Sequence, residues 1–252
     1  MQIRDNSDIF IFFDDGGVLN DNEIRGKQWK KYCGELFSSR FGGDPETWGE
    51  VNYQVISQYI DIFWKDWKEV FPDYLNFYAN YKIDWVNAMF EFAGRELPSN
   101  LDHKQLFDDV VDYVIPKVRS AIPGVIKSIN LLYKRGYSLY TASGEVSKEL
   151  KMYLDSMCIK DLFKGFYGPD LINTWKYGAE FYDNIFKELN LNPENAIVVD
   201  DNPRFLDSAI QIGANVVQAS INGKFDPQYP YYVENMKNLP KIIKILLESH
   251  NL

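Results

Sequence analysis

The sequence has few of the residues that build disulfide frameworks or histidine-rich metal sites. Its 252 residues include two cysteines and two histidines. Cys33 and Cys158 have no metal-type spacing, so we expect both to be reduced thiols in the core. Two histidines are too few for a multi-histidine zinc site. His250 lies in the tail, so a histidine-based triad would depend on His103 alone.

The chain also lacks long apolar runs and an excess of basic residues. Its longest apolar runs, such as residues 9–13, are about five residues long, whereas a membrane span needs about 20. The N-terminus shows no basic segment followed by an apolar stretch and a cleavage site, so we expect no secretion signal and a cytoplasmic location. The short apolar runs argue against a membrane partner. The net charge of −9 argues against nucleic-acid binding, but not against a phosphorylated small molecule, because a bound metal can reverse the local field.

The composition is that of a globular protein, 46% hydrophobic and 25% charged. Along the chain, strand-like apolar segments alternate with helix-like ones. Short β-branched and aromatic runs predict strands at residues 8–13, 137–141, 165–167, 196–199 and 214–217. Helical patterns lie between most of them, at residues 123–134, 145–157, 179–189 and 203–212, and a short helix is predicted at 239–247. This alternation predicts an α/β fold with a Rossmann-like parallel sheet flanked by helices.

One region interrupts the alternation. Residues 20–120 show helical periods and no clear strand, and they hold five of the six tryptophans: Trp29, Trp48, Trp64, Trp67 and Trp85. We therefore predict an α/β core at 1–19 and 121–252, with a helical cap at 20–120 inserted after the first strand. The aromatic side chains are expected to pack the interior of this cap.

Polar residues with catalytic potential follow the predicted strands. Asp14 ends the first strand, Thr141 the second, and the pair Asp200 and Asp201 the strand at 196–199, while Lys176 precedes the helix leading into that last strand. The carboxyl ends of parallel strands meet at one edge of a sheet, so these side chains should converge there. Carboxylates offer Mg²⁺ hard oxygen ligands, and a lysine neutralises phosphate charge. The set suits phosphoryl transfer through a carboxylate nucleophile.

Four segments, in order, resemble the motifs of the haloacid dehalogenase (HAD) superfamily. FDDGGVLND at residues 13–21 resembles the first motif, and the strand ending at Thr141 resembles the second. KYGAEFY at residues 176–182 resembles the third without its prolines, and VVDDNP at 198–203 resembles the fourth. The match extends over residues 9–217. It implies a hydrolase with a C1 cap that selects the substrate.

The resemblance also implies a role for each matching residue. Asp14 would be the nucleophile and a metal ligand, Thr141 would hydrogen-bond the transferring group, and Lys176 would hold Asp14 and the phosphate. Asp201, with help from Asp200, would bind Mg²⁺. The backbone carbonyl of Gly16 would be a further ligand.

The first motif departs from the family pattern at Gly16. The family usually has a second aspartate there, which protonates the leaving group and later activates water. Asp15 is not expected to replace it, because adjacent side chains leaving a strand point in opposite directions. Loss of a general acid typically costs about 10²–10⁴-fold on a poor leaving group and less on one that is stable as an anion.

Three functions remain open on the sequence alone. The first is a Mg²⁺-dependent phosphohydrolase or phosphonatase that forms an aspartyl phosphate at Asp14 and acts on a small phosphorylated metabolite. The second is a metal-independent 2-haloacid dehalogenase, which needs no acid at Gly16 because halide leaves without a proton. The third is a HAD-like binding or interaction module without catalysis. A monomer and a homodimer are both compatible with the sequence.

Overall fold

The structure is a computed structural model that describes residues 6–65, 73–221 and 223–249, with side chains left out at 59–65. It divides into two compact units. The first consists of residues 1–22 and 120–252, and the second of residues 23–119. The second unit is thus one continuous insertion in the sequence of the first. Trp64 and Trp67 lie outside the described side chains, and His250 lies outside the described residues.

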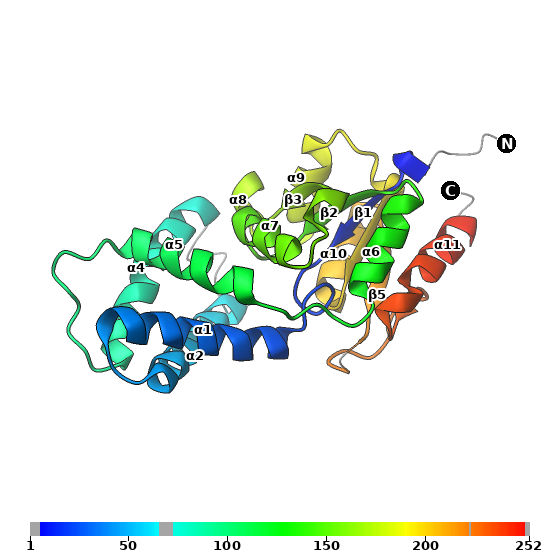
Figure 1. The fold of residues 1–252 in the computed structure, drawn as a ribbon. Helices are drawn as coiled ribbons and strands as arrows, with labels where there is room; N and C mark the ends of the chain where they lie inside the picture. The colour runs from blue at the N-terminus through cyan, green and yellow to red at the C-terminus, as the bar shows by residue number, and fades with distance from the viewer. Residues whose placement is uncertain (1–5, 66–72, 222, 250–252) are drawn as a thin grey trace. The chain divides into compact units, whose positions relative to one another are not determined.

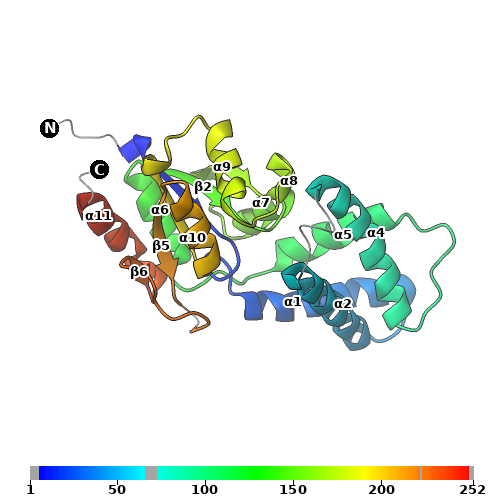
Figure 2. The ribbon, with the colours of Figure 1, turned by 180° about the vertical axis from the view of Figure 1, so that it is seen from behind.

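The first unit is built on a parallel sheet that has six strands within the described residues (Figures 1 and 2). In sheet order the strands are β3 (Phe163–Tyr167), β2 (Ser138–Ala142), β1 (Phe10–Phe13), β4 (Ala196–Asp200), β5 (Asn215–Ala219) and β6 (Tyr232–Val233). Along the sequence, β2 and β3 are added on one side of β1, and β4, β5 and β6 are then added on its other side. The direction of winding therefore reverses beside β1, which is where open α/β sheets bind their ligands.

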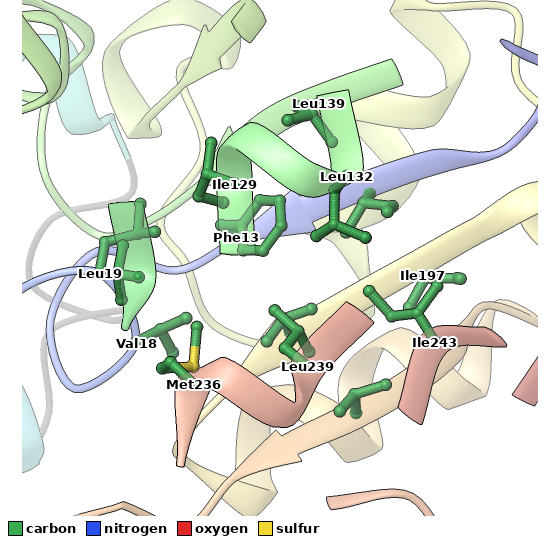
Figure 3. Packing of buried hydrophobic residues seen from close by; sticks show 14 of the residues in the cluster. Phe13, Val18, Leu19, Ile129, Leu132, Leu139, Ile197, Met236, Leu239 and Ile243 are labelled. Atoms are coloured by element: carbon green, nitrogen blue, oxygen red, sulfur yellow. The ribbon is translucent and has the colours of Figure 1, made fainter. Parts of the chain in front are cut away.

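Helices cover both faces of this sheet. On one face lie α6 (Val125–Lys134), α7 (Ser147–Ser156) and α11 (Leu239–Ser249), and on the other α9 (Ala179–Glu188) and α10 (Pro203–Gln211). The short helix α8 (Pro169–Ile172) follows β3. Alternation along β1 sends Ile11 and Phe13 into the first layer and Phe12 into the second. Figure 3 shows Phe13 among the side chains of the first layer. The predicted α/β class with a parallel sheet is confirmed.

The predicted elements agree with the observed ones to within one or two residues at most ends. The first strand was predicted from residue 8, but residues 6–8 form a 3₁₀ turn closed by the Ile9 amide on the carbonyl of Asn6. The prediction of Cys158 as a core residue was wrong. It follows α7 at a left-handed φ of 57° and is exposed, whereas Cys33 is buried. Neither α8 nor β6 was predicted, since four and two residues are too short for a periodic signal.

The second unit consists of helices in its described part: α1 (Asn22–Phe41), α2 (Pro45–Lys65), α4 (Tyr74–Phe92) and α5 (His103–Val114). Its interior is aromatic. The ring of Phe37 lies 5.0 Å from that of Trp48 and 5.7 Å from that of Trp85, and both indoles are almost fully buried. These tryptophans therefore have the packing role that the sequence predicted. No helix in the described residues is long and apolar enough to cross a membrane.

Candidate active site

The two central strands place two aspartates side by side at the carboxyl edge of the sheet. Phe13 of β1 and Val199 of β4 are register partners, and each is followed directly by an aspartate, Asp14 and Asp200. The amide of Asp14 donates to the carbonyl of Val199 at 3.0 Å, which holds the two chain segments together beyond the last strand pair. Two carboxylates are therefore brought together at the point where the sheet reverses its winding.

Lys176 joins these two carboxylates. Its ammonium lies 2.8 Å from Oδ1 of Asp14 and 2.6 Å from Oδ2 of Asp200, and the side chain is 5% exposed. It also stands over the ring of Phe205, 4.7 Å from the ring centre. Burial by itself lowers the pKa of Lys176, but the carboxylates of Asp14 and Asp200 offset this and raise that pKa above its ordinary value. The lysine is therefore a permanent cation at the centre of the site.

The loop that carries Lys176 has none of the prolines of the third motif described above. The amide of Tyr177 donates to the carbonyl of Trp175 at 2.7 Å, which makes a tight turn centred on the lysine. The Tyr177 ring meets the edge of Phe205, and the guanidinium of Arg204 lies 4.5 Å from its centre. Packing by aromatic and cationic side chains thus restrains a segment that proline would otherwise have restrained.

A third carboxylate completes an acidic cluster. Asp14, Asp200 and Asp201 each offer one oxygen, and these atoms lie within 4.8 Å of one another. Burial raises the pKa of Asp201 to about 6, with a further contribution from the charge of Asp14. Burial also raises the pKa of Asp200, and Lys176 offsets this in part. The ammonium of Lys176 pairs with only two of these three carboxylates, so a bound cation would neutralise the negative charge that remains.

This donor set fits a hard divalent metal ion. The three carboxylates are the oxygen ligands that Mg²⁺ and Ca²⁺ prefer, and two of them lie in buried surroundings where an unneutralised charge is costly. Asp200 is fixed further, because its Oδ1 accepts the amide of Asn202 at 2.8 Å. Mg²⁺ would be held by Asp14 and Asp201, with Asp200 beside them.

Gly17 lies against this cluster, which the sequence did not reveal. Its φ is +86°, and a Cβ added there would stand 2.6 Å from Oδ2 of Asp201. Only glycine combines this backbone conformation with so close an approach. The pair Gly16-Gly17 in the sequence indicates an unusual turn, but it does not indicate that Gly17 lies against Asp201. Phe205 under the lysine was also missed, because nothing in a sequence predicts which ring a lysine will meet.

The surroundings of Thr141, Gly16 and Asp15 are as follows. Thr141 is fully buried in β2, and its hydroxyl is directed at the carbonyl of Tyr167 at 3.4 Å. Gly16 is partly exposed and pairs with Asn20 in an isolated bridge. The carboxylate of Asp15 accepts the side-chain amide of Asn20 at 2.7 Å. The structure therefore brings together Asp14, Lys176, Asp200 and Asp201, while the Asp15 carboxylate is bonded to Asn20.

A sequence profile of the family described as "Haloacid dehalogenase-like hydrolase" matches residues 56–219, well over half of the chain. The chain belongs to this family. No curated protein sequence matches the chain significantly. The match covers the third and fourth motifs and the strand β2, which contains Thr141.

Solved HAD structures share the fold across nearly the whole chain. One is the HAD-hydrolase YfnB from Bacillus subtilis, bound to magnesium, with a TM-score of 0.63 and 13% identity over 93% of this chain and 98% of that one. The 2-haloacid dehalogenase from Pseudomonas syringae has a TM-score of 0.63 and 15% identity, covering 94% of this chain and 99% of its own. A HAD phosphatase from Thermococcus onnurineus has a TM-score of 0.61 and 17% identity, covering 93% and 97%. At these identities the likeness shows the fold alone.

The contact between Gly17 and Asp201 gives a first prediction. Gly17→Ala should lose stability through its positive φ and should also displace the Asp201 carboxylate, weakening Mg²⁺ binding about tenfold or more. Gly136→Ala is a matched control, since Gly136 has a φ of +89° but its added Cβ would meet only Asn6, at 3.8 Å. Isothermal titration with Mg²⁺ compares the two variants. Equal Mg²⁺ affinities would show that the close approach does not matter for the metal.

The raised pKa of Asp201 gives a second prediction, for the metal-free protein. The folded state holds this proton more tightly than the unfolded state, so the contribution of Asp201 to stability falls as pH rises from 3.8 to about 6. Asp201→Asn should therefore stabilise the protein at pH 7 by about 1–3 kcal/mol, and the gain should disappear near pH 4. Thermal unfolding in EDTA across this range measures it, with exposed Asp161→Asn as control. A less stable Asp201→Asn at pH 7 would contradict this account.

Proposed function

We propose that this protein is a Mg²⁺-dependent phosphohydrolase in which Asp14 is the nucleophile. The observation that supports this most directly is the cluster of Asp14, Asp200 and Asp201, whose oxygens lie within 4.8 Å of one another, with the ammonium of Lys176 paired to Asp14 and Asp200. A carboxylate nucleophile beside a cation-binding acidic pair is the arrangement that phosphoryl transfer needs. The substrate in this proposal is a small phosphorylated metabolite.

The chemistry proceeds in two steps at Asp14. Its carboxylate oxygen attacks phosphorus, the bond from phosphorus to the leaving group breaks, and the leaving group departs with the electron pair. Water then attacks the phosphorus of the aspartyl phosphate, which releases inorganic phosphate and restores the carboxylate. Lys176 orients Asp14 through the 2.8 Å ion pair and places positive charge beside the transferring group. Mg²⁺ held by Asp14 and Asp201 would supply further neutralisation of that group.

The glycine at position 16 limits the leaving groups that this site can release. No carboxylate is available there to protonate a departing alkoxide, and the buried Asp15 carboxylate is bound to Asn20. A general acid is typically worth about 10²–10⁴-fold. We therefore infer that the substrates are donors whose leaving groups are already stable as anions, such as acyl phosphates.

The helical unit of residues 23–119 would serve as the cap that selects the substrate. It is inserted in the sequence between β1 and β2, so both of its ends join the core next to the segment that follows Asp14. The core supplies the carboxylates and the lysine, while specificity would come from the insertion.

A 2-haloacid dehalogenase is the second candidate. Gly16 favours it, because halide leaves as an anion without a proton, and a dehalogenase is among the proteins that share this fold. The charge of the site weighs against it. A 2-haloacid is itself an anion, and a cluster of three carboxylates with one lysine would repel it unless a cation were bound.

Substitution of the nucleophile tests the proposed reaction. Asp14→Asn should reduce turnover to background, at least about 10³-fold below wild type, because the amide cannot form the aspartyl phosphate. The assay is phosphate release with and without Mg²⁺ from acetyl phosphate, phosphonoacetaldehyde, p-nitrophenyl phosphate and sugar phosphates. Circular dichroism checks that the variant is folded. Halide release from 2-chloropropionate without metal would favour the dehalogenase, and Mg²⁺ binding without any turnover would favour a binding module.

Restoring a carboxylate at position 16 tests the leaving-group argument. Gly16→Asp should raise kcat/KM on sugar phosphates relative to acetyl phosphate and p-nitrophenyl phosphate, by up to about 10²-fold, because only poor leaving groups need the proton. The ratio between substrates is the measurement, so a general loss of folded protein does not affect it. An unchanged ratio would mean that another group already donates the proton.

A further inference from the structure

The loop that follows the nucleophile is closed at its base by a buried polar network. The carbonyl of Asp15 accepts the amides of Leu19 and Asn20 at 2.9 and 2.8 Å, and the amide of Gly17 donates back to the carbonyl of Asn20 at 2.8 Å. Residues 15–20 thus form a small closed loop. Leu19 and Val18 anchor it in the core layer next to Met236 (Figure 3).

Three side chains reinforce this closure. Oδ1 of Asp15 accepts the side-chain amide of Asn20 at 2.7 Å, and Oδ1 of Asn20 accepts the hydroxyl of Ser120 at 2.6 Å. Asp15 and Asn20 are fully buried, and Ser120 is 2% exposed. A buried hydrogen-bond network of this kind is strong when every member is paired, and costly when one partner is removed.

The same residues tie the nucleophile loop to the place where the chain leaves and re-enters the core. The amide of Asp21 donates to the carbonyl of Ser120 at 2.7 Å, and that of Ile122 donates to the carbonyl of Leu19 at 3.0 Å. Asn20 and Ala121 form an antiparallel bridge between these hydrogen bonds. Ser120 therefore holds Asn20 from across this short ladder, 100 positions away in the sequence.

We propose that Asp15, Asn20 and Ser120 form a clasp that positions the nucleophile loop, and that Asp15 is a positioning residue of the active site. The loop base fixes Gly16 and Gly17, and Gly17 in turn lies against the carboxylate of Asp201. A change in the clasp is therefore transmitted to the acidic cluster without contact with the substrate. The effect on Mg²⁺ and turnover rests on the proposed function, whereas the effect on the loop does not.

The chain offers a closely matched pair of serines for the test. Ser120 and Ser128 are both 2% exposed, and each hydroxyl donates at 2.6 Å, Ser120 to Asn20 and Ser128 to the carbonyl of Met236. Ser128 lies in α6, outside the clasp. Ser120→Ala and Ser128→Ala should therefore lose similar global stability, and any difference between them near residue 15 reports on the clasp.

Amide hydrogen exchange of the full chain, without metal, tests the clasp itself. In Ser120→Ala the amides of Leu19 and Asn20 should exchange about tenfold faster than in Ser128→Ala, because the buried oxygen of Asn20 loses its donor. Asp15→Asn keeps the size of the side chain and should also raise the exchange rates of these two amides. It replaces Ser120→Ala as the test variant if Ser120→Ala does not fold. Equal exchange at these amides in the serine variants, or no change in Asp15→Asn, would overturn the proposal.

Mg²⁺ titration and steady-state kinetics on acetyl phosphate test the consequence for catalysis. Ser120→Ala should bind Mg²⁺ about three- to tenfold more weakly and lose kcat with little change in KM, because the substrate-binding residues are untouched. Ser128→Ala should change neither. Altered exchange with unchanged Mg²⁺ affinity and kcat would refute the positioning role. If the wild-type chain neither bound Mg²⁺ nor turned over, the proposed function would fail, while the exchange comparison would still decide whether the clasp exists.

Discussion

The ion pairs of Lys176 with Asp14 and Asp200 are the contact on which the rest of the site depends. Two carboxylates at the ends of adjacent strands, with a third beside them, would repel one another in buried surroundings. The lysine offsets part of this repulsion and leaves a surplus of negative charge that suits a divalent cation. Burial and the nearby charge of Asp14 accordingly raise the pKa of Asp201 to about 6.

Much of the scaffold follows from patterns that a sequence displays directly. Apolar runs of about five residues ending in aspartate identify strands and the edge at which the site lies, because parallel strands must present their carboxyl ends together. Asp14, Asp200 and Asp201 lie together at one edge for that reason. Lys176 joined them although its loop lacks the family's prolines, and Tyr177, packed against Phe205 and Arg204, restrains that loop instead.

Other features depend on tertiary contacts that local patterns do not encode. The approach of Gly17 to Asp201 joins segments more than 180 residues apart, and the hydroxyl of Ser120 reaches Asn20 across an insertion. Thr141 shows the same limit. Its position at the end of β2 could be predicted, but the direction of its hydroxyl toward Tyr167 depends on β3 beside it. Cys158 was misplaced because the left-handed turn after α7 carries its side chain outward.

The ladder between residues 19–21 and 120–122 has a consequence for how such a chain can evolve. The amide of Asp21 and the carbonyl of Ser120, at the two ends of the insertion, are only 2.7 Å apart. A domain whose entry and exit points coincide in this way can be lengthened, replaced or removed while the host sheet keeps its strand order, because the host needs only a tight turn to close the gap. The core can therefore keep one set of reacting groups while the inserted segment changes in sequence. New specificities can then arise by exchange of the inserted segment, without changes to the catalytic residues.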